Sequence, residues 1–69
     1  MADEAERREH TGLGAEIVKK DSDVSVQKGE VMIRRVTGEA IKVSGKVNVY
    51  AGDKLFWIAD CAYTLQYNT

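Results

Sequence analysis

From Ala15 onward, β-branched residues alternate with polar residues in short runs along the chain. Val24 and Val26 flank Ser25, and the same pattern recurs around Lys42. Alternation with a period of two is typical of strands that bury one face. Turn residues separate the runs, among them the glycines at positions 29, 38, 45 and 52. The pattern therefore indicates a succession of short strands joined by tight turns.

The runs predict strands over residues 15–20, 23–27, 30–36, 39–44, 46–50, 54–58 and 61–67. No segment between them is long enough for a crossover helix, so consecutive strands should pair antiparallel. A sheet with one apolar face must cover that face against another layer. The sequence thus predicts an all-β fold, either a small antiparallel barrel or a two-layer sandwich.

The first part of the chain follows a different pattern, rich in alanine, glutamate and arginine and without an apolar face. Glu4 and Arg8 have the spacing that supports a helix, but a short helix alone in water is unstable. Residues 11–14 contain two glycines, which would end a helix. We expect residues 1–14 to form an acidic tail, either disordered or a short helix ordered by a partner, and residues 15–69 to form the β domain.

A chain of sixty-nine residues makes one small domain, which buries only about 60% of its unfolded surface. Such domains commonly rely on disulfides, a metal or oligomerisation. Cys61 is the only cysteine and His10 the only histidine, so the count excludes an internal disulfide and a zinc site built from Cys and His. The size argument therefore favours association with a second copy or with a larger partner.

Charge and targeting signals restrict the possible partners and the localisation only slightly. Residues 1–23 hold seven acidic and four basic residues, a balance of −3, and residues 24–69 hold four acidic and six basic residues, a balance of +2. This excess is too small to steer a polyanion strongly. The sequence shows no signal peptide and no apolar run of membrane-spanning length. We expect a cytoplasmic protein without membrane contact, or a component of an assembled particle.

The sequence contains few candidate catalytic residues. The single histidine lies in the predicted tail, which removes the usual general base for a Ser, Thr or Cys nucleophile. Asp21, Asp53 and Asp60 fall in predicted turns, where aspartate commonly accepts backbone hydrogen bonds. Cys61 opens a strand and is expected to be a small buried apolar residue. The sequence therefore predicts no enzyme activity, no cofactor and no bound metal.

Aromatic residues concentrate in the last twenty residues of the chain. In residues 55–58 both strand faces are apolar, with Leu55 and Trp57 on one and Phe56 and Ile58 on the other. Three interpretations remain open: a core strand packed under the tail, a strip that docks a protein, or a stacking platform for single-stranded nucleic acid. The candidate interface residues are Tyr50, Phe56, Trp57, Tyr63 and Tyr67.

These features favour a non-enzymatic protein-interaction or assembly module, a subunit of a homo-oligomer or of a larger particle such as a phage or virus. Two alternatives stay open. One is a small β-barrel that binds nucleic acid, and the other is a small inhibitor of another macromolecule.

Overall fold

The computed structural model describes residues 5–58 and 60–68. These residues form strands and turns, with no helix among them. The strands are β1 (Ala5–His10), β2 (Gly14–Ile17), β3 (Ser22–Lys28), β4 (Val31–Arg34), β5 (Ala40–Val43), β6 (Lys46–Val49), β7 (Lys54–Trp57) and β8 (Cys61–Tyr67).

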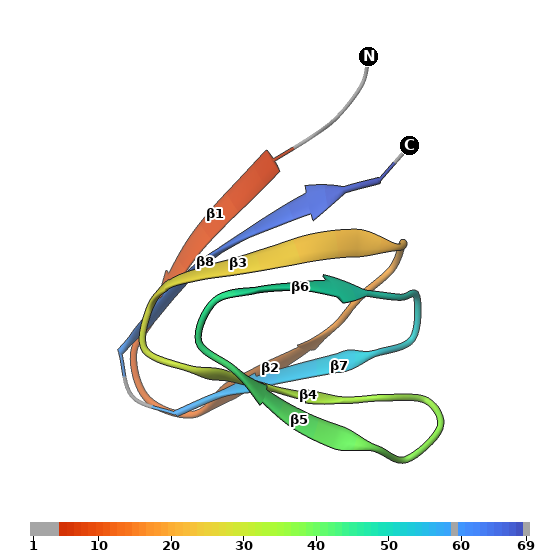
Figure 1. Ribbon diagram of the computed structural model, residues 1–69. Helices are drawn as coiled ribbons and strands as arrows, with labels where there is room; N and C mark the ends of the chain where they lie inside the picture. The colour runs from red at the N-terminus through yellow and green to blue at the C-terminus, as the bar shows by residue number, and fades with distance from the viewer. Residues whose placement is uncertain (1–4, 59, 69) are drawn as a thin grey trace.

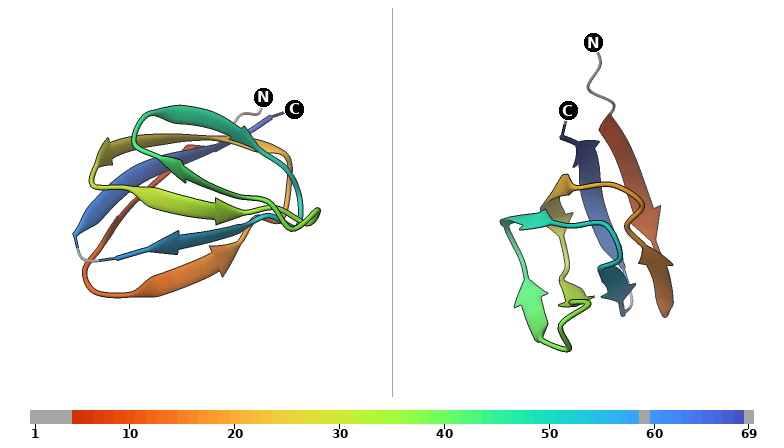
Figure 2. Two further views of the ribbon diagram at one scale, coloured as in Figure 1. Left: turned by 60° about the horizontal axis from the view of Figure 1, so that its bottom comes forward. Right: turned by 90° about the vertical axis from the view of Figure 1, so that its right-hand side faces the viewer.

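The strands form two four-stranded antiparallel sheets, which pack face to face (Figure 1). One sheet has the order β1-β8-β3-β6 and the other the order β2-β7-β4-β5. Consecutive strands alternate between the two sheets, except β4 and β5, which are neighbours in one sheet. The β1–β2 connection lies at one edge of the sandwich and the β5–β6 connection at the opposite edge (Figure 2). The all-β prediction is confirmed, and the fold takes the form of two packed sheets.

The seven predicted strands are all present, and most are shorter than predicted by one to three residues at an end. Three of the four glycines expected in turns, Gly29, Gly38 and Gly52, have a positive φ. A positive φ favours glycine, because a Cβ atom would clash with the backbone there. The turn positions were therefore readable from the sequence with little error.

The beginning of the chain differs from the prediction. Ala5–His10, expected to be helical or disordered, form β1, which pairs with β8 from Ala5 opposite Gln66 to His10 opposite Cys61. The free edge of β8 offers a row of backbone donors and acceptors, and pairing with it outweighs the weak helix preference of this segment. The prediction for residues 1–4 lies outside the described residues.

The core lies between the two sheets and is built from the inward residues of most strands. Alternate positions point inward, so β3 contributes Val24 and Val26, and β4 contributes Val31 and Ile33. The buried cluster consists of Val18, Val24, Val26, Val31, Ile33, Val49, Leu55, Trp57, Cys61, Tyr63 and Leu65. The burial of Cys61 agrees with its expected role as a small apolar residue.

Aspartates stabilise the turns at one end of the sandwich. The carboxylate of Asp53 is buried and accepts a hydrogen bond from the backbone N–H of Tyr50 at 3.0 Å, within its own turn. The same oxygen pairs with the guanidinium of Arg35 at 2.8 Å. Asp21 instead accepts from the backbone N–H of Ala51 at 3.0 Å, which ties two loops together. These contacts give Asp53 and Asp21 structural roles.

Candidate interaction surface

The outer face of the β1-β8-β3-β6 sheet is polar over its whole described extent. It carries two acidic and three basic side chains, and one of the bases, Lys28, pairs with Asp60 at 3.3 Å. The other outward residues have hydroxyl or amide groups, apart from the small Ala62, which is 3% exposed. This composition is typical of a sheet face that contacts only water. The outward polar residues of its strands are Arg7, Glu9, Asp23, Ser25, Gln27, Lys28, Lys46, Asn48, Thr64 and Gln66.

The outer face of the β2-β7-β4-β5 sheet is different, because apolar side chains run across it. Leu13 is 82% exposed, Ile58 72% and Met32 38%, and Phe56 is half-buried between them. Ala15 and Met32 are the register partners of Phe56 on the two flanking strands, so these three side chains lie in one row. We call Leu13, Ala15, Met32, Phe56 and Ile58 the apolar strip.

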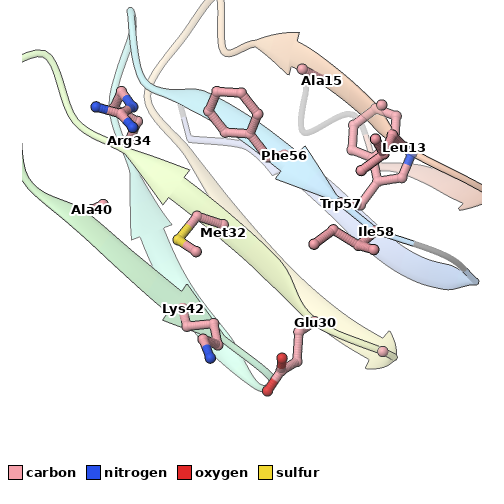
Figure 3. Close-up of a pocket in the computed structure, with 12 residues that line it drawn as sticks. Leu13, Ala15, Glu30, Met32, Arg34, Ala40, Lys42, Phe56, Trp57 and Ile58 are labelled. Carbon is pink, nitrogen blue, oxygen red and sulfur yellow. The ribbon is translucent and has the colours of Figure 1, made fainter.

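The apolar strip lines an open groove of about 900 Å³ (Figure 3). Met32 and Phe56 lie near its centre, and Leu13 and Ile58 lie together at one end. Arg34 borders the groove at the other end. The groove follows the open sheet surface and is not an enclosed cavity.

Three cations border the strip on the same face. Arg34 on β4 is the register partner of Lys54 on β7, and Lys42 on β5 is the partner of Met32. We call Arg34, Lys42 and Lys54 the cationic corner. Within the described residues, none of the three forms a salt bridge, although the Lys54 amine lies 5.6 Å from the centroid of the Phe56 ring. The outward carboxylate of this face is Glu30, at the border of the groove.

Two of the five candidate aromatic residues lie in the core. Tyr63 is fully buried and Trp57 is 8% exposed, with their ring centroids 6.0 Å apart. His10 stacks on Trp57 with ring centroids 3.7 Å apart, so β1 closes over these two rings. Trp57 and Tyr63 therefore stabilise the folded chain itself, and of the two only Trp57 borders the groove.

The other three candidates lie in separate places. Phe56 belongs to the apolar strip. Tyr50 is 52% exposed in the turn after β6, where the guanidinium of Arg35 lies 5.4 Å from its ring centroid. Tyr67 is half-buried at the end of β8, beneath the amine of Lys20 at 5.0 Å. Whether any of these residues forms an interface stays a prediction.

A polar cluster closes the side of the sandwich where β1 leads into β2. The inward carboxylate of Glu16 on β2 accepts hydrogen bonds from Arg8 of β1 and from the phenol of Tyr63 of β8. Burial raises the pKa of Tyr63 strongly, and its hydrogen bond to the Glu16 carboxylate raises it further. Burial alone would lower the pKa of Arg8, but the carboxylates of Glu16 and Glu6 outweigh it, so the pKa is raised. The cluster is structural, since its donors and acceptors satisfy one another.

Potential metal and nucleophile chemistry is sparse in the described part of the chain. His10 and Cys61, distant in sequence, are register partners on neighbouring strands. Two such residues are too few to hold a zinc ion, and no group of three potential ligands occurs in residues 5–58 and 60–68. Burial raises the pKa of the Cys61 thiol, which keeps it protonated and a poor nucleophile.

The residues of this surface that sequence reasoning missed are the aliphatic and cationic ones, Leu13, Met32, Arg34, Lys42 and Lys54. Strand alternation already predicted that Met32 points outward, away from Val31 and Ile33. Met32 contacts the row of Phe56 because β4 and β7 are neighbours in this register. That information was absent from the pattern of a single strand.

Over the part of the chain that the structure describes, no helix is long and apolar enough to cross a membrane. Comparison of the chain with protein-family models, with curated proteins and with solved structures finds no significant match in any of the three.

Proposed function

We propose that this chain is a non-enzymatic interaction and assembly module, which docks a protein through the outer face of the β2-β7-β4-β5 sheet as a subunit of an oligomer or a larger particle. The observation that carries the proposal is the contrast between the two outer faces. Both sheets belong to one small domain, yet one face is polar throughout and the other carries the apolar strip. Contiguous exposed apolar surface on a soluble domain marks an interaction site.

The groove geometry supports the same proposal. Leu13 and Ile58 project at one end of the groove, beside the row formed by Ala15, Phe56 and Met32. Adjacent apolar side chains of this kind form the centre of protein interfaces, and polar or charged residues form the rim. The cationic corner has the position of such a rim on one side of the strip.

Two measurements with one set of variants test the proposal. The test variant combines Met32→Ser and Ile58→Ser, and the control combines Asn48→Ser and Gln66→Ser on the polar face. Light scattering over a wide range of concentrations detects association with a second copy. Selection from a random peptide library on the immobilised chain detects binding to other proteins.

We expect wild type and control to associate or to select peptides, and the test variant to lose that binding while it keeps its circular dichroism spectrum. A chain that stays monomeric and selects no peptide that depends on the strip contradicts the proposal.

Single-stranded nucleic acid is a second candidate partner, because the Lys54 amine lies close to the Phe56 ring on this face. A stacked base beside a cation is a common element of such sites. Titration with oligo-dT at low and high salt tests it. Binding that weakens steeply with salt and is lost in a Phe56→Ala variant would favour this candidate. An inhibitor function would use the same surface as the main proposal and differ only in the partner.

A further inference from the structure

We infer that the partner segment docked on the apolar strip is acidic and amphipathic, with apolar side chains that fill the groove and carboxylates that reach the cationic corner. This inference rests on the proposed function and adds the chemistry of the partner. It concerns charge and sidedness, which the apolar strip alone does not determine.

The first support is the charge of the face. The groove face carries three basic side chains and one carboxylate, so its net charge is +2. The basic residues are Arg34, Lys42 and Lys54, and the carboxylate is Glu30. On the opposite face, three basic side chains accompany two acidic ones, and the third base, Lys28, forms a salt bridge with Asp60 at 3.3 Å. The whole chain has a net charge of −1, so the positive balance is local to the groove. Complementary charge is what directs a partner to one surface rather than another.

The second support is the arrangement of the cations. Arg34 and Lys54 are direct register partners, and Lys42 lies diagonally across from Arg34 on the next strand. Like charges directly opposite each other on neighbouring strands destabilise a sheet. No carboxylate of the described residues forms a salt bridge with any of the three. A partner with carboxylates at these positions would relieve the repulsion on binding.

The same charges argue against a second copy stacked face to face. A twofold contact through this face would place six cations against two copies of Glu30 in one interface. The apolar part argues against nucleic acid, because Leu13 and Ile58 are aliphatic and cannot stack on bases. Phe56 is the one ring that projects outward from this sheet within the described residues. An acidic amphipathic protein segment can contact the apolar strip with its apolar side chains and the cationic corner with its carboxylates.

Three synthetic peptides of equal length test the inference. They share the same leucine positions, and the remaining positions are all glutamate, all lysine or all glutamine. Each peptide carries a fluorescent label, and its anisotropy is followed as the full chain is added. We expect the glutamate peptide to bind at least about tenfold more tightly than the lysine peptide in about 50 mM salt, and to lose most of this preference in about 500 mM salt.

A pair of charge reversals locates the effect on the molecule. Arg34→Glu changes the centre of the cationic corner, and Lys46→Glu makes the same change on the polar face, where Lys46 is exposed on β6. We expect Arg34→Glu to weaken binding of the glutamate peptide about tenfold and to improve binding of the lysine peptide. Lys46→Glu should change either affinity less than about twofold. Urea unfolding of both variants confirms that each remains folded.

The outcomes separate this inference from the proposed function. Equal binding of the three peptides, or equal effects of the two reversals, overturns the acidic partner and leaves an apolar docking surface in place. Tighter binding of oligo-dT than of the glutamate peptide, lost in Arg34→Glu, overturns the inference in favour of nucleic acid. Self-association that competes with the glutamate peptide overturns it in favour of a second copy. A library selection that yields peptides dependent on the strip but without acidic residues also contradicts it.

Discussion

Gly14 lies at the edge of the sandwich, where β2 is an edge strand and the indole of Trp57 lies over its backbone. The two residues are register partners, and a Cβ atom at Gly14 would overlap the indole ring. An aromatic ring over a glycine on an edge strand covers backbone that would otherwise be exposed. The glycine here therefore serves a close packing contact, and its φ is not positive.

Replacement of Gly14 by alanine should lower the free energy of unfolding by about 1–3 kcal/mol, because the indole must move out of the buried cluster. Gly45→Ala is the matched control, since a Cβ atom there meets nothing within 4 Å and its φ is not positive. Urea unfolding followed by fluorescence of Trp57, the only tryptophan, measures both changes. Equal effects of the two substitutions would argue against the packing contact.

Tyr63 should make stability depend on alkaline pH. Its pKa is raised in the folded chain, so above about pH 10 the unfolded chain releases the phenol proton first. Unfolding then becomes more favourable as pH rises, at a rate of at most about 1.4 kcal/mol per pH unit. Stability linked to this group is complete below about pH 10 and falls above it.

The variant Tyr63→Phe tests this linkage. It should cost about 1–2 kcal/mol at about pH 7 through loss of the hydrogen bond to Glu16. The difference from wild type should shrink at about pH 11, because phenylalanine has no proton to release. Cys61 is present in both chains, so its own raised pKa cancels in the comparison. A difference that stays constant with pH would contradict the raised pKa of the phenol.

At the scale of elements, β1 shows how the tertiary structure overrides a local preference. Its inward residues are polar: Arg8 pairs with Glu16 of β2, and His10 stacks on Trp57. The buried Nε2 of His10 has no hydrogen-bond partner among the described residues. The strand also supplies the backbone pairing for one edge of β8. The segment expected to be a disordered or helical tail thus closes one side of the sandwich.

Removal of β1 should destabilise the whole domain. A chain that starts at Thr11 loses the pairing with β8 and leaves Glu16 without the guanidinium of Arg8. We expect a loss of several kcal/mol, which is comparable to the total stability of a domain this small. A chain that starts at Ala5 is the control, since it keeps the pairing and these side-chain contacts. If the chain from Thr11 unfolds in urea like wild type, β1 is not part of the folded unit.

At the scale of the whole molecule, the sandwich has two inner faces that form one core and two outer faces of unlike character. Leu55 and Ile58 illustrate the difference along one strand and its continuation. Leu55 is fully buried between the sheets, and Ile58 is 72% exposed at the end of the groove. The same type of side chain therefore stabilises the fold in one position and is free to contact a partner in the other.

The substitution Leu55→Ala should lower the free energy of unfolding by about 2–5 kcal/mol, because it leaves a cavity in the core. Ile58→Ala should change it by less than about 0.5 kcal/mol, since little buried surface is lost. Urea unfolding of the two variants compares them directly. A large effect of Ile58→Ala on an isolated chain would indicate that the groove is already filled in solution, by a second copy or by rearrangement.

Local patterns determined the strand class, the turn positions and the inward side of most strands. Alternation of Val24, Ser25 and Val26 was sufficient for that, because a side-chain period of two is a property of the strand itself. The same patterns separated Leu55 and Trp57 from Phe56 and Ile58 on the two faces of β7. Both assignments depend only on neighbours along the chain.

Only the tertiary structure decided where β1 lies and what the outer faces look like. Isolated residues 5–10 favour no strand, and the pairing energy that orders them comes from β8, more than fifty positions away in the sequence. Likewise, Met32 becomes a neighbour of Phe56, and Arg34 of Lys54, through the strand order β2-β7-β4-β5. Contacts between distant strands depend on register and sheet order, which the period of a single strand does not encode.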